Sequence, residues 1–248
     1  MTCAIVCVGM LSADADTSGL VKKLASKDNE VRREAARDLG ELGKDAKSAT
    51  KALVKALKDK DRFVRRFAAQ ALGNIGTDAA KDAIPGLTAL IDDDNAPVRE
   101  ASIKALAKMG PAAVPALTKA LGSTTDVQEV AVNALGEAGT AGIPALSGVI
   151  KNPKISATLR TRAITLLPKD TEARPALPAL VEAAAKPAGG QDGRQLRIAA
   201  IQAVGRVATS DDAAAVAALD KLAKDEARPN MPFRRQAEAA LKSVQARK

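Results

Sequence analysis

The sequence predicts an all-α fold, an α-solenoid of about seven helix pairs, on three observations. A 13-residue motif, VRREAARDLGELG at residues 31–43, recurs with starts at residues 31, 64, 98, 127, 159, 196 and 233. Self-similarity at a period of roughly 20–50 residues indicates stacked repeats. A shorter apolar segment lies between successive copies, and a residue suited to capping a helix stands three positions before each copy.

Each copy of the motif predicts the second helix of one repeat. Motif positions 1, 5, 9 and 12 are apolar, as in Val31, Ala35, Leu39 and Leu42, and they form one buried stripe at helical spacing. Position 10 is often glycine, which costs about 1 kcal/mol relative to alanine within a helix. We therefore expect a neighbouring helix to approach closely at Gly40, Gly73, Gly136 and Gly205.

Capping residues predict where the second helices begin and end. The residues three positions before the motif belong to the set preferred at helix N-caps: Asp28, Asp61, Asn95, Thr124, Ser156, Gly193 and Asn230. Glycines that close the motif predict left-handed C-caps at Gly43, Gly76, Gly110 and Gly139. Pro168 replaces the position-10 residue of the fifth copy, so we expect that helix to end near Leu167.

The apolar segments between the motifs predict the first helix of each repeat, at residues 49–57, 83–91, 113–121, 142–150 and 176–184. A proline lies near the start of four of them, where the first helical turn tolerates it: Pro85, Pro115, Pro144 and Pro178. Two segments, residues 186–194 and 228–232, interrupt the pattern and are predicted to be surface loops.

The composition of the chain argues against several kinds of binding site. Lys and Arg number 38 against 29 Asp and Glu, a net charge of +9, but both signs are interspersed, which favours a solvated helical surface over a dedicated polyanion site. Aromatic residues make up 1% of the chain, too few to line a deep aromatic ligand pocket. Histidine is absent and both cysteines lie in the first ten residues, so we expect no metal, no cofactor and no disulfide framework.

The N-terminal segment differs from the rest and divides the chain into residues 1–15 and a repeat domain at residues 16–248. Its apolar character and the Ala13-Asp14-Ala15 sequence fit a signal peptide, although no basic residue precedes Lys22. An upstream start, or an apolar segment packed on the first repeat, is the alternative. The segment is too short to span a membrane. The sequence favours export, to a periplasmic or extracellular location, over a cytoplasmic one.

The patterns D-x-x-V-R-x-x-A-x-x-x-L-G-x-[IL]-G in the second helix and [AI]-[IV]-P-x-L in the first resemble HEAT repeats, specifically the PBS-lyase HEAT-like type. The resemblance covers nearly everything from Leu20 onward. It implies antiparallel helix pairs and a role as a scaffold or protein-binding surface. Enzymes of the wider group depend on His-Glu iron ligands, on aromatic residues that hold a nucleotide, or on a bilin-binding pocket, and this chain has no His, Trp or Tyr.

Arginine recurs at motif position 2, with Gln128 as the exception. A cation in the first turn of a helix is unfavourable by a few tenths of a kcal/mol, so a compensating partner is expected. We favour a structural ladder, in which each side chain bonds carbonyls or carboxylates of its own or the adjacent repeat, over a row of phosphate contacts. The ladder residues are Arg32, Arg65, Arg99, Arg160, Arg197 and Arg234.

Motif positions 3, 7 and 11 project away from the apolar stripe, and in HEAT-like solenoids the second helices line the concave face. The resemblance thus implies a partner-binding row, with ordinary solvated side chains as the alternative at any single position: Arg33, Arg37, Glu41, Arg66, Gln70, Asn74, Glu100, Lys104, Lys108, Glu129, Asn133 and Glu137. The run Asp92–Asp94 lacks the alternate spacing of a calcium loop and is interpreted as a solvated turn.

Together these observations predict a non-enzymatic, monomeric scaffold that binds a protein or peptide along its concave face. No histidine base, glycine-rich phosphate loop or converging carboxylate pair supports catalysis, and no catalytic residue is assigned. The alternative is a nucleic-acid-binding basic solenoid, which would use the net charge of +9.

Overall fold

The structure is a computed structural model, and it describes residues 17–169, 171–186, 189–224 and 232–247. Every regular element in these ranges is helical, which confirms the predicted all-α class. The predicted signal segment at residues 1–15 and the predicted cap Asn230 lie outside the described residues.

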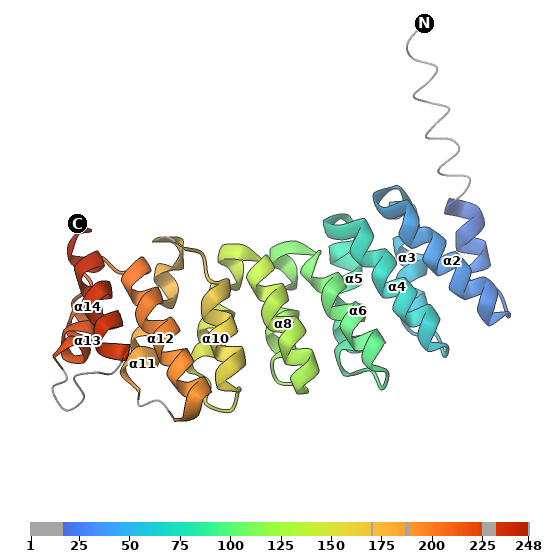
Figure 1. Ribbon diagram of the computed structural model, residues 1–248. Helices are drawn as coiled ribbons and strands as arrows, with labels where there is room; N and C mark the ends of the chain where they lie inside the picture. The colour runs from blue at the N-terminus through green and yellow to red at the C-terminus, as the bar shows by residue number, and fades with distance from the viewer. Residues whose placement is uncertain (1–16, 170, 187–188, 225–231, 248) are drawn as a thin grey trace, which may run out of the picture. The chain divides into compact units, whose positions relative to one another are not determined.

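The second helices of the repeats occupy the motif copies, as predicted (Figure 1). They are α2 (Asn29–Leu42), α4 (Arg62–Ile75), α6 (Ala96–Ala107), α8 (Thr125–Glu137), α10 (Ala157–Leu166), α12 (Gly190–Val207) and α14 (Pro232–Gln245). The first helices alternate with them: α3 (Thr50–Ala56), α5 (Ala80–Ala89), α7 (Val114–Ala120), α9 (Ile143–Lys151), α11 (Leu177–Ala185) and α13 (Ala213–Ala223).

Short 3₁₀ turns join most second helices to the first helix that follows. They are η1 (Gly43–Ala49), η2 (Gly76–Ala79), η4 (Gly110–Ala113), η5 (Gly139–Gly142) and η6 (Thr171–Ala176), while η3 (Leu90–Asp92) continues α5. A tight turn of this kind reverses the chain within few residues, so the two helices of a pair can pack against each other.

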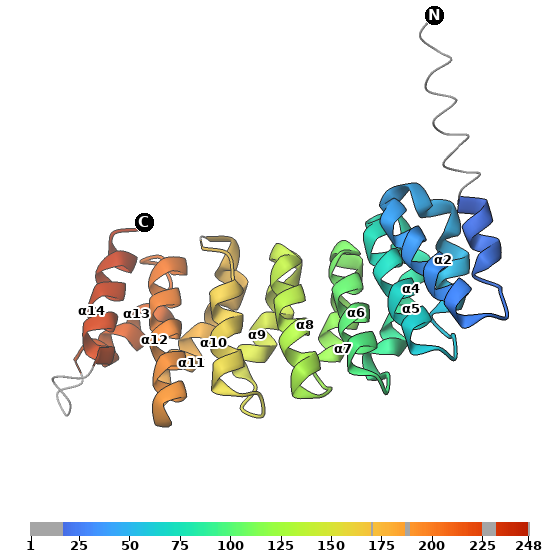
Figure 2. The same ribbon diagram turned by 45° about the vertical axis from the view of Figure 1, so that its right-hand side comes forward.

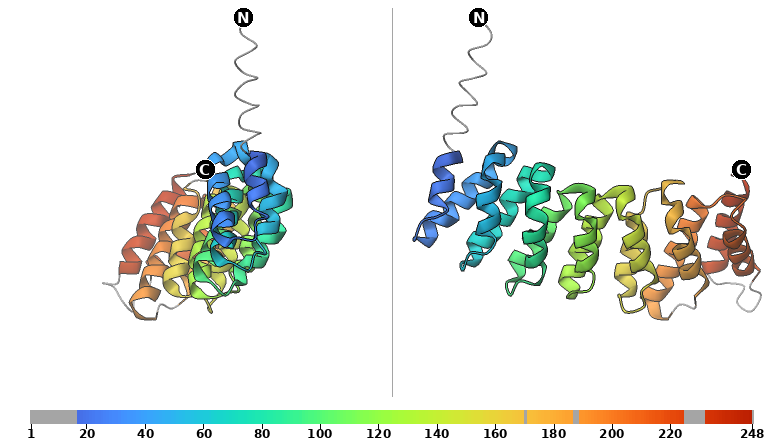
Figure 3. Two further views of the ribbon diagram at one scale, coloured as in Figure 1. Left: turned by 90° about the vertical axis from the view of Figure 1, so that its right-hand side faces the viewer. Right: turned by 180° about the vertical axis from the view of Figure 1, so that it is seen from behind.

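The chain forms two compact units, a first unit up to Ala134 and a second unit from Leu135, with the boundary inside α8. In the first unit α2 packs on α4 and α4 on α6, while α3 packs on α4 and α5. In the second unit α10, α12 and α14 pack in that order and α11 packs on α9, α12 and α13 (Figures 2 and 3). Each unit is thus two layers of helices around one apolar core.

The core consists of the predicted stripe. In α4 the position-1, -5, -9 and -12 residues Val64, Ala68, Leu72 and Ile75 are at most 1% exposed. Alanine supplies many of these positions, and its small side chain lets helices pack closely. In α2 the corresponding Val31 remains half-buried, because it has no preceding second helix among the described residues to cover it.

Close helix packing explains the mid-helix glycines. A Cβ atom added to Gly73 would lie 2.9 Å from the Cα of Ala105, and one added to Gly205 would lie 2.9 Å from the Cα of Ala240. Gly136 meets Leu166 in the same way, whereas Gly40 has ordinary contact distances. In each case the neighbour belongs to the next second helix, so the expected close approach is confirmed at three of the four glycines.

Most of the predicted caps are confirmed. The side chains of Asp28, Asp61 and Ser156 accept first-turn N–H groups, and Asn95 occupies the N-cap position without a side-chain bond. Gly193 is a wrong prediction, because α12 begins at Gly190. Glycine does not stop a helix outright, and Asp192 in the first turn favours the extension. The loop predicted at residues 186–194 is therefore helical from Gly190.

The closing glycines have positive φ, as predicted, at Gly43, Gly76, Gly110 and Gly139. The ψ values of Gly43 and Gly76, −124° and −143°, place them outside the left-handed helical well, in a region that essentially only glycine adopts. The helix α10 ends at Leu166, with Leu167 as its C-cap, which confirms the end expected before Pro168.

Pro85 departs from the prediction that the recurring prolines occupy first turns. Pro115, Pro144 and Pro178 lie within the first two positions of their helices, but Pro85 is the sixth residue of α5. The connector before Pro85 is four residues longer than the one before Pro115, counted from the preceding glycine. The extra residues form one more helical turn ahead of the proline, so the same residue falls inside the helix.

Candidate protein-binding surface

The residues at motif positions 3, 7 and 11 of α2, α4, α6 and α8 are here called the second-helix surface. Most of them are exposed, and Arg33, Arg66 and Asn133 are half-buried. The exposed members are Arg37, Glu41, Gln70, Asn74, Glu100, Lys104, Lys108, Glu129 and Glu137. Polar side chains at these positions are therefore available to solvent, but their contacts with one another differ greatly.

Arg33 has a structural role in the first unit. Its Nε and Nη2 atoms donate to the two oxygens of Asp61, at 3.0 and 2.5 Å, and its Nη1 bonds Glu30 at 2.5 Å. Its guanidinium also lies 4.6 Å from the centre of the Phe63 ring. The bonds from Arg33, together with two first-turn amides, lower the pKa of Asp61 to about 2. Arg33 thus ties α2 to the start of α4.

Two further members of the surface connect consecutive second helices. The Asn74 side-chain amide donates to the Gly40 carbonyl at 3.0 Å, and its oxygen accepts from Lys108 Nζ at 2.9 Å. These bonds link α2 to α4 and α4 to α6. Within α6, Lys104 pairs with Glu100 at 2.5 Å, an exposed ion pair that contributes little to stability.

Arg66 and Gln70 have polar groups that bond no other residue in the part of the chain that the structure describes. Arg66 Nε is buried, and no acceptor among the described residues lies within hydrogen-bonding distance of it. The Arg66 guanidinium instead lies 4.7 Å from the centre of the Phe67 ring and 5.5 Å from that of Phe63. The exposed Gln70 side chain stands one turn further along the helix.

Phe63 and Phe67 were not predicted as part of a site, because each falls within the helical pattern. The signal that could have found them is their spacing. In a chain with three phenylalanines and no Trp or Tyr, two of them stand four residues apart among three arginines. Residues three or four apart share one face of a helix. The spacing therefore predicts contacts between the Phe63 and Phe67 rings and nearby arginine side chains of the same helix.

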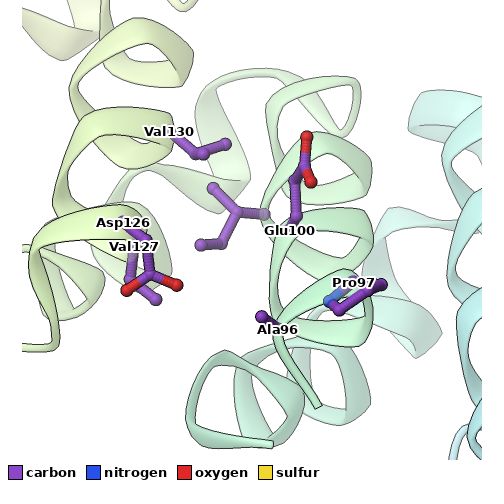
Figure 4. A pocket seen from close by; sticks show the side chains of 7 residues that line it. Ala96, Pro97, Glu100, Asp126, Val127 and Val130 are labelled. Atoms are coloured by element: carbon purple, nitrogen blue, oxygen red, sulfur yellow. The ribbon is translucent and has the colours of Figure 1, made fainter.

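Two grooves lie between consecutive second helices of the first unit. The α2–α4 groove has a volume of about 180 Å³ and is lined by Arg37, Gly40, Glu41, Phe67, Gln70 and Asn74. The α6–α8 groove has a volume of about 310 Å³ and is lined by Ala96, Pro97, Glu100, Ile103, Asp126, Val127 and Val130. Figure 4 shows Glu100 on one helix and Asp126 on the other, with the Val130 side chain extending into the space between them. Both grooves can receive a small side chain.

The position-2 arginines of the first unit bond carboxylates of the following repeat. Arg32 donates to both oxygens of Asp59 at 2.7 and 2.9 Å, and Arg65 donates to both oxygens of Asp93 at 2.8 and 2.9 Å. Arg99 reaches a single oxygen of Asp126 at 2.8 Å, and its buried Nε has no acceptor among the described residues. Each arginine also donates to a carbonyl just before its own helix: that of Ser26, Asp59 or Asp93.

The position-2 residues from Gln128 onward bond differently. Gln128 donates to the Ser123 carbonyl at 3.1 Å. Arg160 Nε donates to the Ile150 carbonyl at 2.8 Å, and Arg197 Nε to the Ala184 carbonyl at 2.9 Å. Burial lowers the pKa of Arg160, an effect that the charge of Glu182 opposes. Arg234 pairs with Glu238 of its own helix at 2.9 Å.

The acidic run Asp92–Asp94 is predicted to be a solvated turn, and the structure departs from this prediction at Asp93. The Asp93 side chain is only 7% exposed, because repeat stacking brings Arg65 onto it. Burial would raise the pKa of Asp93, but bonds from Arg65 and the Asn95 amide outweigh it, and the pKa is lowered.

Within the described residues, no cluster of three His, Cys, Asp or Glu side chains could hold a metal ion. None of the described helices is both long and apolar enough to cross a membrane.

Comparison with known proteins agrees with this architecture. The family model for HEAT repeats matches residues 17–107 and 78–136. A crystal structure of an engineered protein is similar over 94% of this chain and 69% of its own, with 24% sequence identity and a TM-score of 0.52. That likeness concerns the fold alone.

Weaker similarity extends to two other solved structures. The CpcE–CpcF complex of phycocyanin lyase from Nostoc sp. PCC7120 shares 24% identity over 92% of this chain and 94% of that one, with a TM-score of 0.49. A designed armadillo repeat protein shares 20% identity over 92% and 99%, with a TM-score of 0.44. No curated protein is significantly similar in sequence. The repeated helix pairs and the match to the family model identify residues 17–136 as HEAT repeats.

Proposed function

We propose that this protein is a non-enzymatic scaffold whose second-helix surface binds a protein or peptide partner. The observation that carries the proposal is the pair of grooves between consecutive second helices, because both are lined by members of the second-helix surface. A row of shallow grooves with polar edges suits an extended or helical peptide, whose side chains enter the grooves one after another. The scaffold supplies rigid spacing between them.

The two grooves have different polar edges, which suits a partner with a defined order of charges. Arg37, Glu41 and Gln70 line the first, and two carboxylates, Glu100 and Asp126, line the second. Of the latter pair, Asp126 is already paired with Arg99, and Glu100 with Lys104. Charged groups at the edge of an interface set orientation and association rate more than affinity.

Site-specific cross-linking tests this proposal. A photoreactive amino acid is placed at Gln70 on the second-helix surface and, as the matched control, at Lys51, an exposed residue of the first helix α3. Both variants are incubated with extract of the source cells, and cross-linked products are separated on denaturing gels. We expect a discrete product with the Gln70 variant and none with the Lys51 variant. Equal products at both positions, or none at either, would refute binding through this surface.

We also propose export, with cleavage after Ala15. The support is the uncharged, apolar character of residues 2–13 and the small residues at Ala13 and Ala15. The mature chain would then lack both Cys3 and Cys7, which suits an oxidising compartment. N-terminal sequencing of the protein from its native host should begin at Asp16. A sequence that begins at Met1 or Thr2 would contradict export by this route.

A further inference from the structure

We propose that the α2–α4 groove binds an acidic peptide segment, with Arg66 receiving a carboxylate and Phe67 an apolar side chain. The proposal rests on the proposed function and assigns the chemistry of the partner at one place on the second-helix surface. Its basis is a cluster of two phenylalanines and three guanidinium groups, of which Phe67 lines the groove. The cluster is here called the Arg–Phe cluster: Arg33, Arg62, Phe63, Arg66 and Phe67.

Arg66 and Arg62 differ from the neighbouring arginines because they have no carboxylate partner. In the first unit, Arg32, Arg33, Arg65 and Arg99 each bond at least one aspartate of the next repeat. The guanidinium groups of Arg66 and Arg62 instead contact phenylalanine rings, with Arg62 5.0 Å from the centre of Phe63. No ion pair joins either of them to any residue in the described ranges. Arg62 and Arg66 are thus two arginines of the first unit that contact rings and form no ion pair within the described residues.

The orientation of Arg66 suits an incoming carboxylate. A guanidinium stacked on an aromatic ring is held in position by that ring, and its Nη groups can still donate to a carboxylate. The buried Nε of Arg66 is not among the donors that a partner can reach. Arg66 lies over two rings, 4.7 Å from Phe67 and 5.5 Å from Phe63. This side chain therefore loses less conformational entropy on binding than a free lysine or arginine would.

The rest of the groove favours a peptide. Phe67 offers an apolar surface beside Arg37 and Glu41, and Gly40 keeps the floor of the groove open. Gln70 is exposed and forms no hydrogen bond to another described residue, so its amide can bond both the N–H and the C=O of a peptide main chain. The volume of about 180 Å³ fits one or two side chains.

A nucleic acid fits this groove less well. Glu41 lines it directly, and Glu34 is exposed on the same helix, α2. These carboxylates would repel a continuous phosphate backbone, whose affinity depends on how many phosphates Lys and Arg side chains neutralise. An acidic peptide can place a carboxylate on Arg66 and keep neutral residues beside Glu41.

Selection from a peptide library tests the inference. A phage-displayed library of random 12-residue peptides is selected on the full chain and on two variants, Arg66→Gln and Arg235→Gln. Arg235 occupies the same motif position in the last repeat and is exposed, so it controls for the loss of one positive charge. Circular dichroism of both variants checks that they remain folded. The measured quantity is the enrichment of Asp and Glu among selected peptides.

We expect enrichment of acidic residues next to an apolar residue on the unmodified chain and on Arg235→Gln, and its loss on Arg66→Gln. The most enriched peptide, labelled with a fluorophore, should bind Arg66→Gln about tenfold more weakly than the unmodified chain, which corresponds to about 1.4 kcal/mol. Arg66→Lys, which keeps the charge and loses the planar fork, should show most of that loss.

Other outcomes overturn the inference in distinguishable ways. Enrichment of basic or neutral peptides alone would refute the acidic partner and leave the scaffold function standing. No enrichment of any peptide would count against both. If a single-stranded 12-nucleotide DNA bound the unmodified chain as tightly as the peptide, with the same loss on Arg66→Gln, the cluster would be a general anion site and the peptide assignment would be wrong.

Discussion

The arginines at motif position 2 occupy equivalent places in both units of the molecule, yet they bond different partners. In the first unit Arg32 and Arg65 bond both oxygens of an aspartate 27 or 28 residues later in the chain. In the second unit Arg160 and Arg197 each donate from Nε to a main-chain carbonyl. The same residue at the same position thus forms ionic cross-links between repeats at Arg32 and Arg65, and bonds helix-end carbonyls at Arg160 and Arg197. Arg234 instead pairs with Glu238 of its own helix.

Within the first unit, the carboxylate that each arginine bonds depends on a single neighbouring position. Asp59 and Asp93 stand two residues before the N-caps Asp61 and Asn95, where stacking places them against the arginine of the preceding repeat. The equivalent residue ahead of Thr124 is Gly122, and Arg99 accordingly reaches only Asp126 and retains an unpaired Nε. The motif places an arginine at position 2 of each of these helices, and the residues of the loop before the next second helix determine which carboxylate it bonds.

Replacement of the position-2 arginine should give the largest change in the free energy of unfolding, and the change should differ between Arg65 and Arg160. Arg65→Met leaves Asp93 buried without its cation, and breaking a buried ion pair on one side typically costs 3–5 kcal/mol. Because Arg65 retains 14% exposure, we expect a loss of about 2–3 kcal/mol. Arg160→Met removes a charge-to-carbonyl bond and leaves no buried charge behind, so it should cost less, about 1.5 kcal/mol. Urea unfolding followed by circular dichroism measures both; equal losses would contradict the comparison.

Completion of the ionic ladder should stabilise the first unit. Gly122→Asp places a carboxylate where Asp59 and Asp93 stand in the two preceding repeats, within reach of the unpaired Nε of Arg99. A Cβ at Gly122 would meet only the Lys119 carbonyl, at 3.4 Å, and its φ is not positive. We expect a gain of about 1 kcal/mol in the free energy of unfolding. Gly122→Asn, which lacks the charge, is the control, and an equal gain from it would rule out the ionic explanation.

Acid should weaken the first unit through Asp61. Its pKa in the folded chain is about 2, below the ordinary 3.8, because Arg33 and two main-chain amides stabilise the carboxylate. A lowered pKa contributes stability above pH 3.8 that is lost as the pH falls toward 2. We expect a loss of about 1 kcal/mol at most, since solvent screens the pair. Asp61→Asn should remove the pH dependence assigned to this group. NMR titration of the Asp61 carboxyl carbon measures its pKa directly, and an unshifted value would contradict the assignment.

Sequence reasoning succeeded where the determining interactions are local. The caps Asp61 and Ser156 bond amides two or three residues away, and the apolar stripe of α4 needs only helical periodicity. It failed at Pro85 and Gly193, where the number of loop residues, and not the motif, decides where a helix starts. For the candidate surface, the exposed positions were predicted, but the pairing of Arg33 with Asp61 and the isolation of Arg66 were not.

The sequence by itself therefore determined the repeat, the alternation of two helices and the glycines that let second helices approach. These features are written in residues close together along the chain. The tertiary structure alone decided the state of each charge: Asp93 buried under Arg65, Arg99 half paired, and Arg66 lying over two rings without an anion. Such contacts join residues of adjacent helices or repeats, so they depend on how those helices stack and on the loops between them.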